Sequence, residues 1–384
     1  MSLTTFSFPT TTLFGVGAVA ELPARLPRMG IRRPLVVTDS GVLKAPAFDQ
    51  LRHVLGSSGQ GTQWFLYSGV HPNPIEMDVI EIARFYQEHG CDGVIAFGGG
   101  SPLDAGKAAR LLIKRPGLKL AEYDYSADWT GLAPLVCIPT TAGTGSEVGR
   151  SAVITPAGTN RKKVLFHPEL LAKLVILDAA LTRDLPAKLT AATGADALTH
   201  CIESFTCPVF HPLCDGIALE GIHLIMDALP KAHLDGHDLE ARGRMLVAAA
   251  MGAVSFQKDL GATHSLAHPL STLCGLHHGL ANALCLKAVM RFNADHKPGL
   301  YRRVGIACGL DVVKCPDTEA DSRTIDCIAG LLAKLGLDGR LRDFGVNESQ
   351  IEPLTTQAFE DPCHQTNAVP VTAADLRTLY LSVR

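Results

Sequence analysis

The chain has 384 residues, more than one ordinary hydrophobic core accommodates, and this length predicts two domains. Hydrophobic residues make up 47% of it and charged residues 19%, proportions that fit a folded globular protein and exclude an intrinsically disordered one. The formal net charge of -3 excludes the strongly basic surface with which proteins bind nucleic acids or anionic membranes. We therefore expect small-molecule partners, with no nucleic acid and no membrane.

Targeting features and cysteines both indicate a reducing, cytoplasmic location. The sequence has no stretch of about 18 uninterrupted apolar residues that would predict a transmembrane helix. Its first nine residues lack the basic segment that opens a secretory signal. The 11 cysteines are odd in number and never spaced C-x-x-C, even where they are densest, at Cys201, Cys207 and Cys214. This pattern predicts buried free thiols rather than disulfides or a thiolate metal site.

The first half of the chain alternates apolar runs with amphipathic segments. Buried strands are predicted at Pro34–Asp39, Cys91–Phe97, Ala133–Pro139 and Leu174–Asp178, and helical periodicity covers Asp78–His89. Strands separated by helices indicate βαβ units, and therefore an α/β domain with a largely parallel, Rossmann-like sheet.

Two glycine-rich turns follow predicted strands. Gly98-Gly-Gly-Ser-Pro-Leu-Asp104 opens a helix, and Pro139-Thr-Thr-Ala-Gly-Thr-Gly-Ser-Glu147 follows the next strand. Backbone N–H groups in such turns bind phosphates, and two turns at strand ends favour a dinucleotide over a single phosphate. Asp39 ends the first strand, where a carboxylate would accept from a ribose 2′-hydroxyl and favour NAD over NADP. An ordinary turn aspartate is an equal alternative.

From Pro186 onward the apolar periodicity is helical, which predicts an all-α second domain. The expected helices are Ala187–Thr206, Asp215–Leu229, Leu239–Gln257, Ala281–Asn293, Ser322–Leu335 and Ala373–Val383. We place the boundary near Asp184-Leu-Pro186, which gives a dinucleotide-binding domain at 1–185 and a metal-binding domain at 186–384.

Acidic and imidazole side chains recur at helical spacing in the second domain. Asp196 and His200 lie four residues apart, as do His264 and His268, so each pair shares one helix face. His277-His278 follows, and four of the 15 histidines fall within residues 264–278. One carboxylate with neutral imidazoles suits iron(II), zinc, manganese or cobalt and leaves the ion a net positive charge. Spacing alone leaves open which histidine is not a ligand.

Together these motifs resemble those of the iron-containing (group III) alcohol dehydrogenases over essentially the whole chain. The resemblance is carried by Gly98–Asp104, Pro139–Glu147, Ala192–His200, His264–Leu270 and His278–Asn282. It implies an NAD-dependent dehydrogenase with an α/β domain followed by a helical domain. It also implies at least a homodimer, paired through the segment Phe6–Phe14.

The resemblance assigns roles to individual residues. The implied metal ligands are Asp196, His200, His264 and His278, with iron(II) as the metal and zinc or manganese as alternatives. His268 is the remaining imidazole, implied beside the nicotinamide and able to relay a proton. The implied NAD-binding residues are Asp39, Gly98, Gly99, Gly100, Ser101, Pro102, Asp104, Thr140, Thr141, Thr144 and Lys162. Intact ligand positions argue against the metal-free maleylacetate reductase branch.

Within this family, several segments are most similar to 4-hydroxybutyrate dehydrogenases, including Cys201–Phe205 and Pro362–Asn367. This similarity implies a short, acidic alcohol or aldehyde, such as 4-hydroxybutyrate or succinate semialdehyde. Arg150 and Lys258 are candidates to pair with its carboxylate; alternatively, both are solvated or contact cofactor phosphates. The expected substrate-side residues are Arg150, Ser151, Lys258, Cys363 and His364.

Four other functions compete with this interpretation. Lactaldehyde or an aldehyde bearing a phosphonate or sulfonate is an alternative substrate. A lyase resembling dehydroquinate synthases would produce no net change in NADH absorbance. A metal hydrolase would not bind NAD, and a non-catalytic relative would not hold a metal. An NADH oxidation assay and a metal analysis therefore separate these classes.

Overall fold

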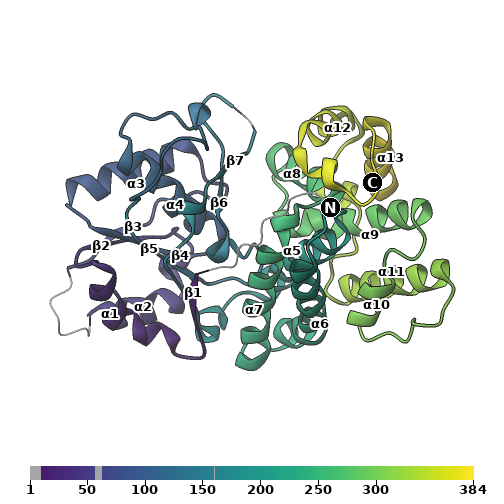
Figure 1. Cartoon of the computed structure of the whole chain (residues 1–384), viewed down its shortest axis with the longest axis horizontal. Helices are drawn as coiled ribbons and strands as arrows, with labels where there is room; N and C mark the ends of the chain where they lie inside the picture. The colour runs from purple at the N-terminus through teal and green to yellow at the C-terminus, as the bar shows by residue number, and fades with distance from the viewer. Residues whose placement is uncertain (1–9, 57–62, 160) are drawn as a thin grey trace.

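A computed structural model describes residues 10–56, 63–159 and 161–384, and shows two regions of different architecture. Strands and helices alternate in the N-terminal region, drawn in purple to teal in Figure 1, whereas helices alone form the green and yellow C-terminal region. The last strand ends at Leu177 and the first long helix of the second region begins at Ala187. The boundary predicted at residue 185 falls in the connection between them.

Six parallel strands form the sheet of the N-terminal region, in the order β1-β8-β5-β4-β2-β3. They span Thr11–Phe14 (β1), Pro34–Val37 (β2), Phe65–Tyr67 (β3), Gly93–Gly98 (β4), Leu135–Pro139 (β5) and Leu174–Leu177 (β8). The predicted parallel α/β sheet is therefore confirmed. The edge strands β1 and β3 were not predicted, because they are short and partly exposed and so carry no apolar run.

Alternation along the central strands builds a core on each face of the sheet. Ile95 and its neighbours Val36 and Val136 pack with α1 (Leu22–Arg25) and α2 (Pro46–Gly56). The opposite face packs against α3 (Glu76–Glu88) and α4 (Gly100–Lys114). A separate antiparallel hairpin of β6 (Ser151–Ile154) and β7 (Lys163–Phe166) extends toward the helical region (Figure 1). This hairpin was not predicted.

The C-terminal region consists of helices packed around α5, as predicted. Its helices are α5 (Ala187–Thr206), α6 (Pro212–Leu234), α7 (Leu239–Ser255), α8 (Ala262–Cys274), α9 (His278–His296), α10 (Arg302–Ala307), α11 (Asp317–Lys334), α12 (Ile351–Glu360) and α13 (Ala373–Val383). Helix α5 contacts α6, α7 and α9, and its alanines and glycine allow this close packing on several sides. No helix within the described ranges has the length and hydropathy needed to cross a bilayer.

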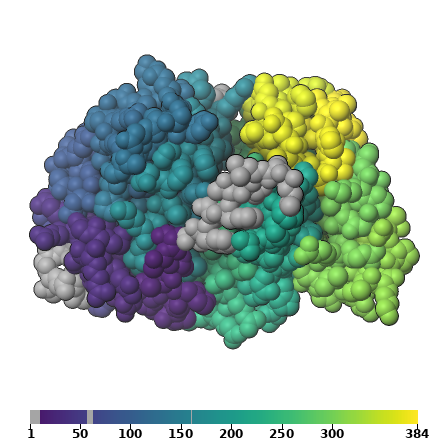
Figure 2. Space-filling model, viewed as in Figure 1, coloured from purple at the N-terminus to yellow at the C-terminus, as the bar shows by residue number. Residues whose placement is uncertain are grey.

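All eleven cysteines are free thiols, as predicted, but only six of them are buried and the other five are partly exposed. The segment Phe6–Phe14, predicted to pair two copies, lies partly outside the described residues. Its described part, β1, pairs with β8 at one edge of the sheet. Figure 2 shows the two regions forming one continuous surface with a notch between the blue and the yellow segments.

Candidate metal and cofactor site

Three helices bring the predicted metal ligands together. Asp196 and His200 lie one turn apart on α5, His264 lies on α8, and His278 opens α9. The start of α9 approaches α5 so closely that a Cβ added to Gly279 would lie 1.9 Å from the Ala192 carbonyl oxygen. Because only glycine permits this approach, the residue after His278 places that imidazole beside α5.

The four side chains converge on one point. The Nε2 atoms of His200 and His264 each lie 3.8 Å from Oδ1 of Asp196, and that of His278 lies 3.4 Å from it. Ligand atoms of Asp196, His200 and His264 all lie within 4.8 Å of one another, and all three residues are buried. The structure therefore brings together the four residues that were predicted as metal ligands.

These separations fit a bound divalent cation. Donors about 2.1 Å from a tetrahedral ion lie about 3.4 Å from one another. The three imidazole nitrogens lie 3.4–3.8 Å from the carboxylate oxygen, too far for good hydrogen bonds and close to the ligand spacing. Oxygen and imidazole donors suit iron(II), zinc or manganese, so the residues fit the implied group.

Burial keeps the imidazoles of His200 and His278 neutral, as ligation requires, whereas at His264 burial is outweighed by the hydrogen bond and charge of Glu203, which raise the pKa. Burial lowers the pKa of His200 to about 4 and the pKa of His278 well below its usual value. At pH 7 both rings therefore carry a lone pair rather than a second proton. One carboxylate and three neutral imidazoles would leave a bound dication with a net charge of about +1.

Glu203 is a buried partner that the sequence reasoning missed. Its Oε2 lies 2.6 Å from Nδ1 of His264, and its Oε1 accepts the backbone N–H of Thr263 at 2.6 Å. Burial alone would raise the pKa of Glu203, but the hydrogen bond and charge of His264 outweigh it and the net shift is downward. The signal was a glutamate seven residues after Asp196 on the same face of an apolar helix.

His268 has a carboxylate partner of its own. Its Nδ1 lies 2.7 Å from Oδ2 of Asp361, whose Oδ1 accepts the Ser265 hydroxyl at 3.0 Å and the Cys363 backbone N–H at 2.9 Å. The His268 ring stacks on that of His278, with 5.2 Å between centroids. The predicted spare imidazole therefore lies beside the converging ligands. Its partner, Asp361, was not predicted.

Asn282 completes the surroundings of the converging ligands. It lies one turn after His278 on α9, and its Nδ2 donates to Oδ1 of Asp196 at 2.8 Å. The same nitrogen lies 3.3 Å from Nε2 of His264 and of His278. The four-residue interval from His278 was the signal in the sequence, where Asn282 entered only as part of a motif.

The predicted cofactor turns lie side by side at one edge of the sheet. Strands β4 and β5 pair with Gly98 opposite Pro139, so the glycine turn and the threonine turn leave neighbouring strands. A Cβ on Gly100 would lie 2.9 Å from Cγ2 of Thr144, and one on Gly99 would lie 3.5 Å from Thr141. Such a surface of glycines beside a helix N-terminus fits a pyrophosphate.

Other predicted cofactor residues occupy the same edge with different partners. Asp39 follows β2, next to β4, and its Oδ1 accepts the N–H groups of Gly41 and Val42. The Asp104 carboxylate accepts from the Ser146 hydroxyl at 2.5 Å and from the Val153 N–H at 3.0 Å. The Ser101 hydroxyl donates to the Pro72 carbonyl oxygen. The side chains of Asp104 and Ser101 therefore form hydrogen bonds within the protein.

The remaining predicted cofactor residues are Pro102 and Thr140, which belong to the two turns, and Lys162. Pro102 lies in the first turn of α4 and would contact a Cβ on Gly98, while Thr140 directly follows β5. Lys162, which directly precedes β7, lines the same pocket as His268, and burial lowers the pKa of Lys162.

The expected substrate-side residues divide into two groups. Lys258 is buried, and its ammonium donates to Asp215 and to the Phe205 carbonyl oxygen, so it is engaged within the protein. His364 stacks on Phe359, and its Nε2 lies 2.9 Å from that residue's carbonyl oxygen.

Arg150, Ser151 and Cys363 have other partners. The Arg150 guanidinium donates to Gln257, next in sequence to Phe256, whose ring lies 5.1 Å from that of His200. Ser151 starts β6, and its carbonyl oxygen accepts from the Lys107 ammonium. The Cys363 sulfur lies within 4.8 Å of ligand atoms of His268 and of its partner Asp361.

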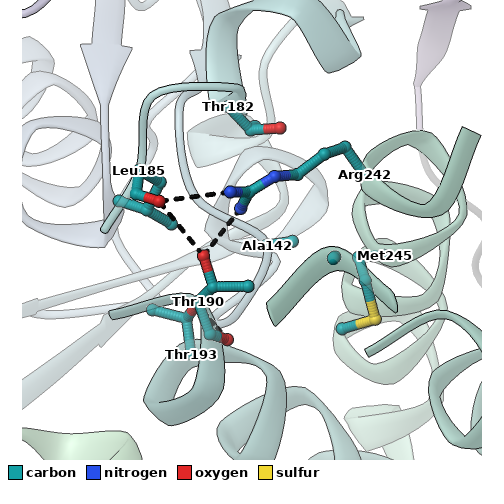
Figure 3. Close-up of a pocket in the computed structure, with 8 residues that line it drawn as sticks. Ala142, Thr182, Leu185, Thr190, Thr193, Arg242 and Met245 are labelled. Carbon is teal, nitrogen blue, oxygen red and sulfur yellow. Dashed lines mark hydrogen bonds between the residues drawn. The ribbon is translucent and has the colours of Figure 1, made fainter. Parts of the chain in front are cut away.

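Arg242 is one of the residues that line a small cavity at the junction of the two regions (Figure 3). Its guanidinium donates to the Thr190 hydroxyl at 2.7 Å and to the Leu185 carbonyl oxygen at 3.1 Å, and its Nε donates to the Gly236 carbonyl oxygen. These bonds join α5 and α7 to the connection after β8. Because its donors bond protein oxygens, Arg242 fixes the junction between the regions.

Comparison with known proteins agrees with this geometry. Residues 9–179 match the family model described as iron-containing alcohol dehydrogenase, and residues 190–383 match that of the C-terminal part of the same family. The chain is 41% identical to a 4-hydroxybutyrate dehydrogenase of Cupriavidus necator over 374 residues, covering 94% of this chain and 95% of that protein.

Solved structures show the same fold. A 1,3-propanediol oxidoreductase superposes with a TM-score of 0.95 at 30% identity, with full coverage of both chains. A sulfoacetaldehyde reductase from Bifidobacterium kashiwanohense, in complex with NAD+, superposes with a TM-score of 0.88 at 28% identity, covering 100% of this chain and 99% of that one. With both halves matched by family models and with such relatives, the chain belongs to the iron-containing alcohol dehydrogenase family.

Proposed function

We propose that this chain is an NAD-dependent, divalent-metal-dependent dehydrogenase of a short acidic alcohol and its aldehyde, such as 4-hydroxybutyrate and succinate semialdehyde. The observation that carries the proposal is the convergence of three imidazoles on Oδ1 of Asp196. The glycine and threonine turns of β4 and β5 support the dinucleotide. The 4-hydroxybutyrate dehydrogenase relative supports the substrate class.

In this proposal, Asp196, His200, His264 and His278 hold the cation, with iron(II) expected from the family. A bound dication would supply positive charge that stabilises an alkoxide more than a neutral carbonyl, while NAD would carry the hydride. Glu203 holds the His264 ring through Nδ1, so that Nε2 keeps its lone pair toward Asp196. The neutral state of His200 follows from its burial.

His268 is the group that moves the proton. Its Nδ1 proton is held by Asp361 at 2.7 Å, which leaves Nε2 free to exchange a proton with the substrate oxygen, directly or through water. Lys162 lines the same pocket and brings a positive charge to this side of the site. The opening of this pocket to solvent provides the route for proton exchange.

Arg150 is the proposed partner of the substrate's acidic group. In support, its guanidinium contacts Gln257, the sequence neighbour of Phe256, whose ring lies 5.1 Å from that of His200. Lys258 is not proposed for this role, because its ammonium is already paired with Asp215. A guanidinium suits a carboxylate, and it suits a sulfonate equally well, so a sulfonate-bearing aldehyde is the second candidate substrate, in line with the sulfoacetaldehyde reductase neighbour.

The test is NADH oxidation on protein loaded with iron(II) or zinc. Succinate semialdehyde, sulfoacetaldehyde and lactaldehyde are compared with a neutral aldehyde of matched length. We expect Arg150→Ala to raise KM for the acidic aldehyde and to leave the neutral one unaffected. If the preference for an acidic aldehyde survives in Arg150→Ala, the anion is bound elsewhere; if loaded protein oxidises no NADH with any aldehyde, the reaction class is wrong.

We also infer a homodimer formed through the outer edge of β1, which is an edge strand among the described residues. This edge strand ends at Phe14 and leads to Val16, and these two residues are 58% and 62% exposed. An unpaired edge next to exposed apolar side chains favours pairing with a second copy. A Phe14→Glu variant should be monomeric by light scattering, and a dimer that survives this change would place the interface elsewhere.

A further inference from the structure

A second group of metal-binding side chains lies beside the Asp196 site. His268, Asp361 and Cys363 each offer one ligand atom, and these atoms lie within 4.8 Å of one another. The same limit describes Asp196, His200 and His264. We propose that His268, Asp361 and Cys363 form a second cation site that takes zinc in preference to iron(II) and whose occupancy blocks the enzyme. The binding stands by itself, whereas the block rests on the function proposed above.

Local structure holds these three side chains together. Asp361 ends α12 and caps the short 3-10 helix Pro362–Thr366 by accepting the backbone N–H of Cys363 at 2.9 Å. That cap turns Cys363 back toward Asp361, and its sulfur lies within 4.8 Å of a carboxylate oxygen. His268 reaches the same carboxylate from α8, with 2.7 Å between Nδ1 and Oδ2. Two elements from distant parts of the chain thus present nitrogen, oxygen and sulfur to one point.

The donor set selects the cation. Thiolate, imidazole and carboxylate are all zinc ligands, and a site with these donors binds zinc more tightly than it binds iron(II). Three protein donors with a fourth position open to water are a common zinc arrangement. In a tetrahedral zinc site donors lie roughly 3.3–3.7 Å apart, so a pair at the 4.8 Å limit has to approach by about 1 Å, while Nδ1 of His268 and Oδ2 of Asp361, at 2.7 Å, have to move apart. Rotation of the Cys363 side chain can provide this approach, with release of the thiol proton.

Charge distinguishes this site from the first. Zinc with one carboxylate, one thiolate and one neutral imidazole is neutral, whereas a dication at Asp196 with three imidazoles keeps a charge of about +1. A neutral complex polarises a substrate oxygen less. Zinc here would also occupy His268 and Asp361, the pair assigned to proton transfer. Occupancy is therefore expected to inhibit and not to activate.

The site is accessible from solvent. His268 and Asp361 line a pocket with Lys162 and Glu360, and their side chains are 23% and 16% exposed. The ion pair between Arg161 and Glu360, at 2.8 Å, joins the hairpin side of this pocket to the C-terminal side. In Figure 2 the yellow C-terminal segment faces the blue segment across the notch at the upper edge of the molecule. A hydrated ion therefore has a route that does not cross the buried Asp196 cluster.

The experiment counts zinc bound per chain. Protein carrying one equivalent of zinc is titrated with further zinc against a chromogenic chelator, and parallel samples receive Co²⁺, whose thiolate complexes have a charge-transfer absorption. We expect a second equivalent and this absorption in wild type, and loss of both in Cys363→Ser. The matched control is Cys274→Ser, a half-buried thiol at the end of α8, which should keep both.

Two further measurements separate the inference from the proposed function. Asp196→Ala should lose the first equivalent and keep the second, whatever the reaction catalysed. Zinc added beyond one equivalent should inhibit NADH oxidation by wild type, and should leave Cys363→Ser at whatever rate that variant shows with one equivalent. Retention of the first equivalent shows that Cys363→Ser is folded. A wild-type stoichiometry of one, or an unchanged second equivalent in Cys363→Ser, overturns the second site.

Discussion

Replacing Glu203 with Gln tests how the His264 ring is held. The two carboxylate oxygens accept from Nδ1 of His264 and from the Thr263 N–H, each at 2.6 Å. Glutamine has one acceptor oxygen and can satisfy only one of these donors. If its oxygen stays with Thr263, its amide faces Nδ1 and favours the tautomer whose proton lies on Nε2. That proton would occupy the lone pair directed at the metal.

The size of the effect follows from this geometry. Loss of such a carboxylate partner lowers metal affinity roughly 10–100-fold, or about 1.4–2.8 kcal/mol. Because Glu203 is buried, solvent does not replace the lost acceptor. Competition titration of zinc against a chelator measures the affinity, with Glu220→Gln on the exposed face of α6 as the control. A zinc affinity of Glu203→Gln within twofold of wild type, in folded protein, would refute the reasoning.

Three further predictions concern stability. Burial raises the pKa of Glu147 from 4.5 to about 7. The contribution of this group to the free energy of unfolding therefore falls as the pH rises from 4.5 through 7. Denaturant titrations should show Glu147→Gln gaining up to about 3 kcal/mol over wild type at pH 8 and nothing at pH 4. Lys258→Met should leave Asp215 unpaired and lower the free energy of unfolding by about 3 kcal/mol, while wild-type substrate preference would persist. Gly279→Ala should displace α9 from Ala192, costing at least about 2 kcal/mol and most of the bound zinc; normal zinc binding would contradict this.

Local periodicity determined much of this protein from its sequence. The central strands are buried on both faces, so their sequences are apolar runs that predict strands. Helices α5 and α13 have the bounds that their apolar periodicity predicted. Asp196 and His200 share a helix face because four residues make about one turn. The same rule paired His264 with His268. Such features depend on neighbours in the chain, so a sequence displays them directly.

The tertiary structure decided which partner each of these side chains meets. His264 and His268 are equivalent in spacing, but Glu203 holds the first beside Asp196 and Asp361 holds the second beside the open pocket. Lys258 was a candidate for the substrate until packing placed Asp215 against it. The edge strands and the hairpin likewise depend on partners across the sheet. Periodicity sets the direction of a side chain on its own helix, whereas its charge state and contacts come from elements brought near it by packing.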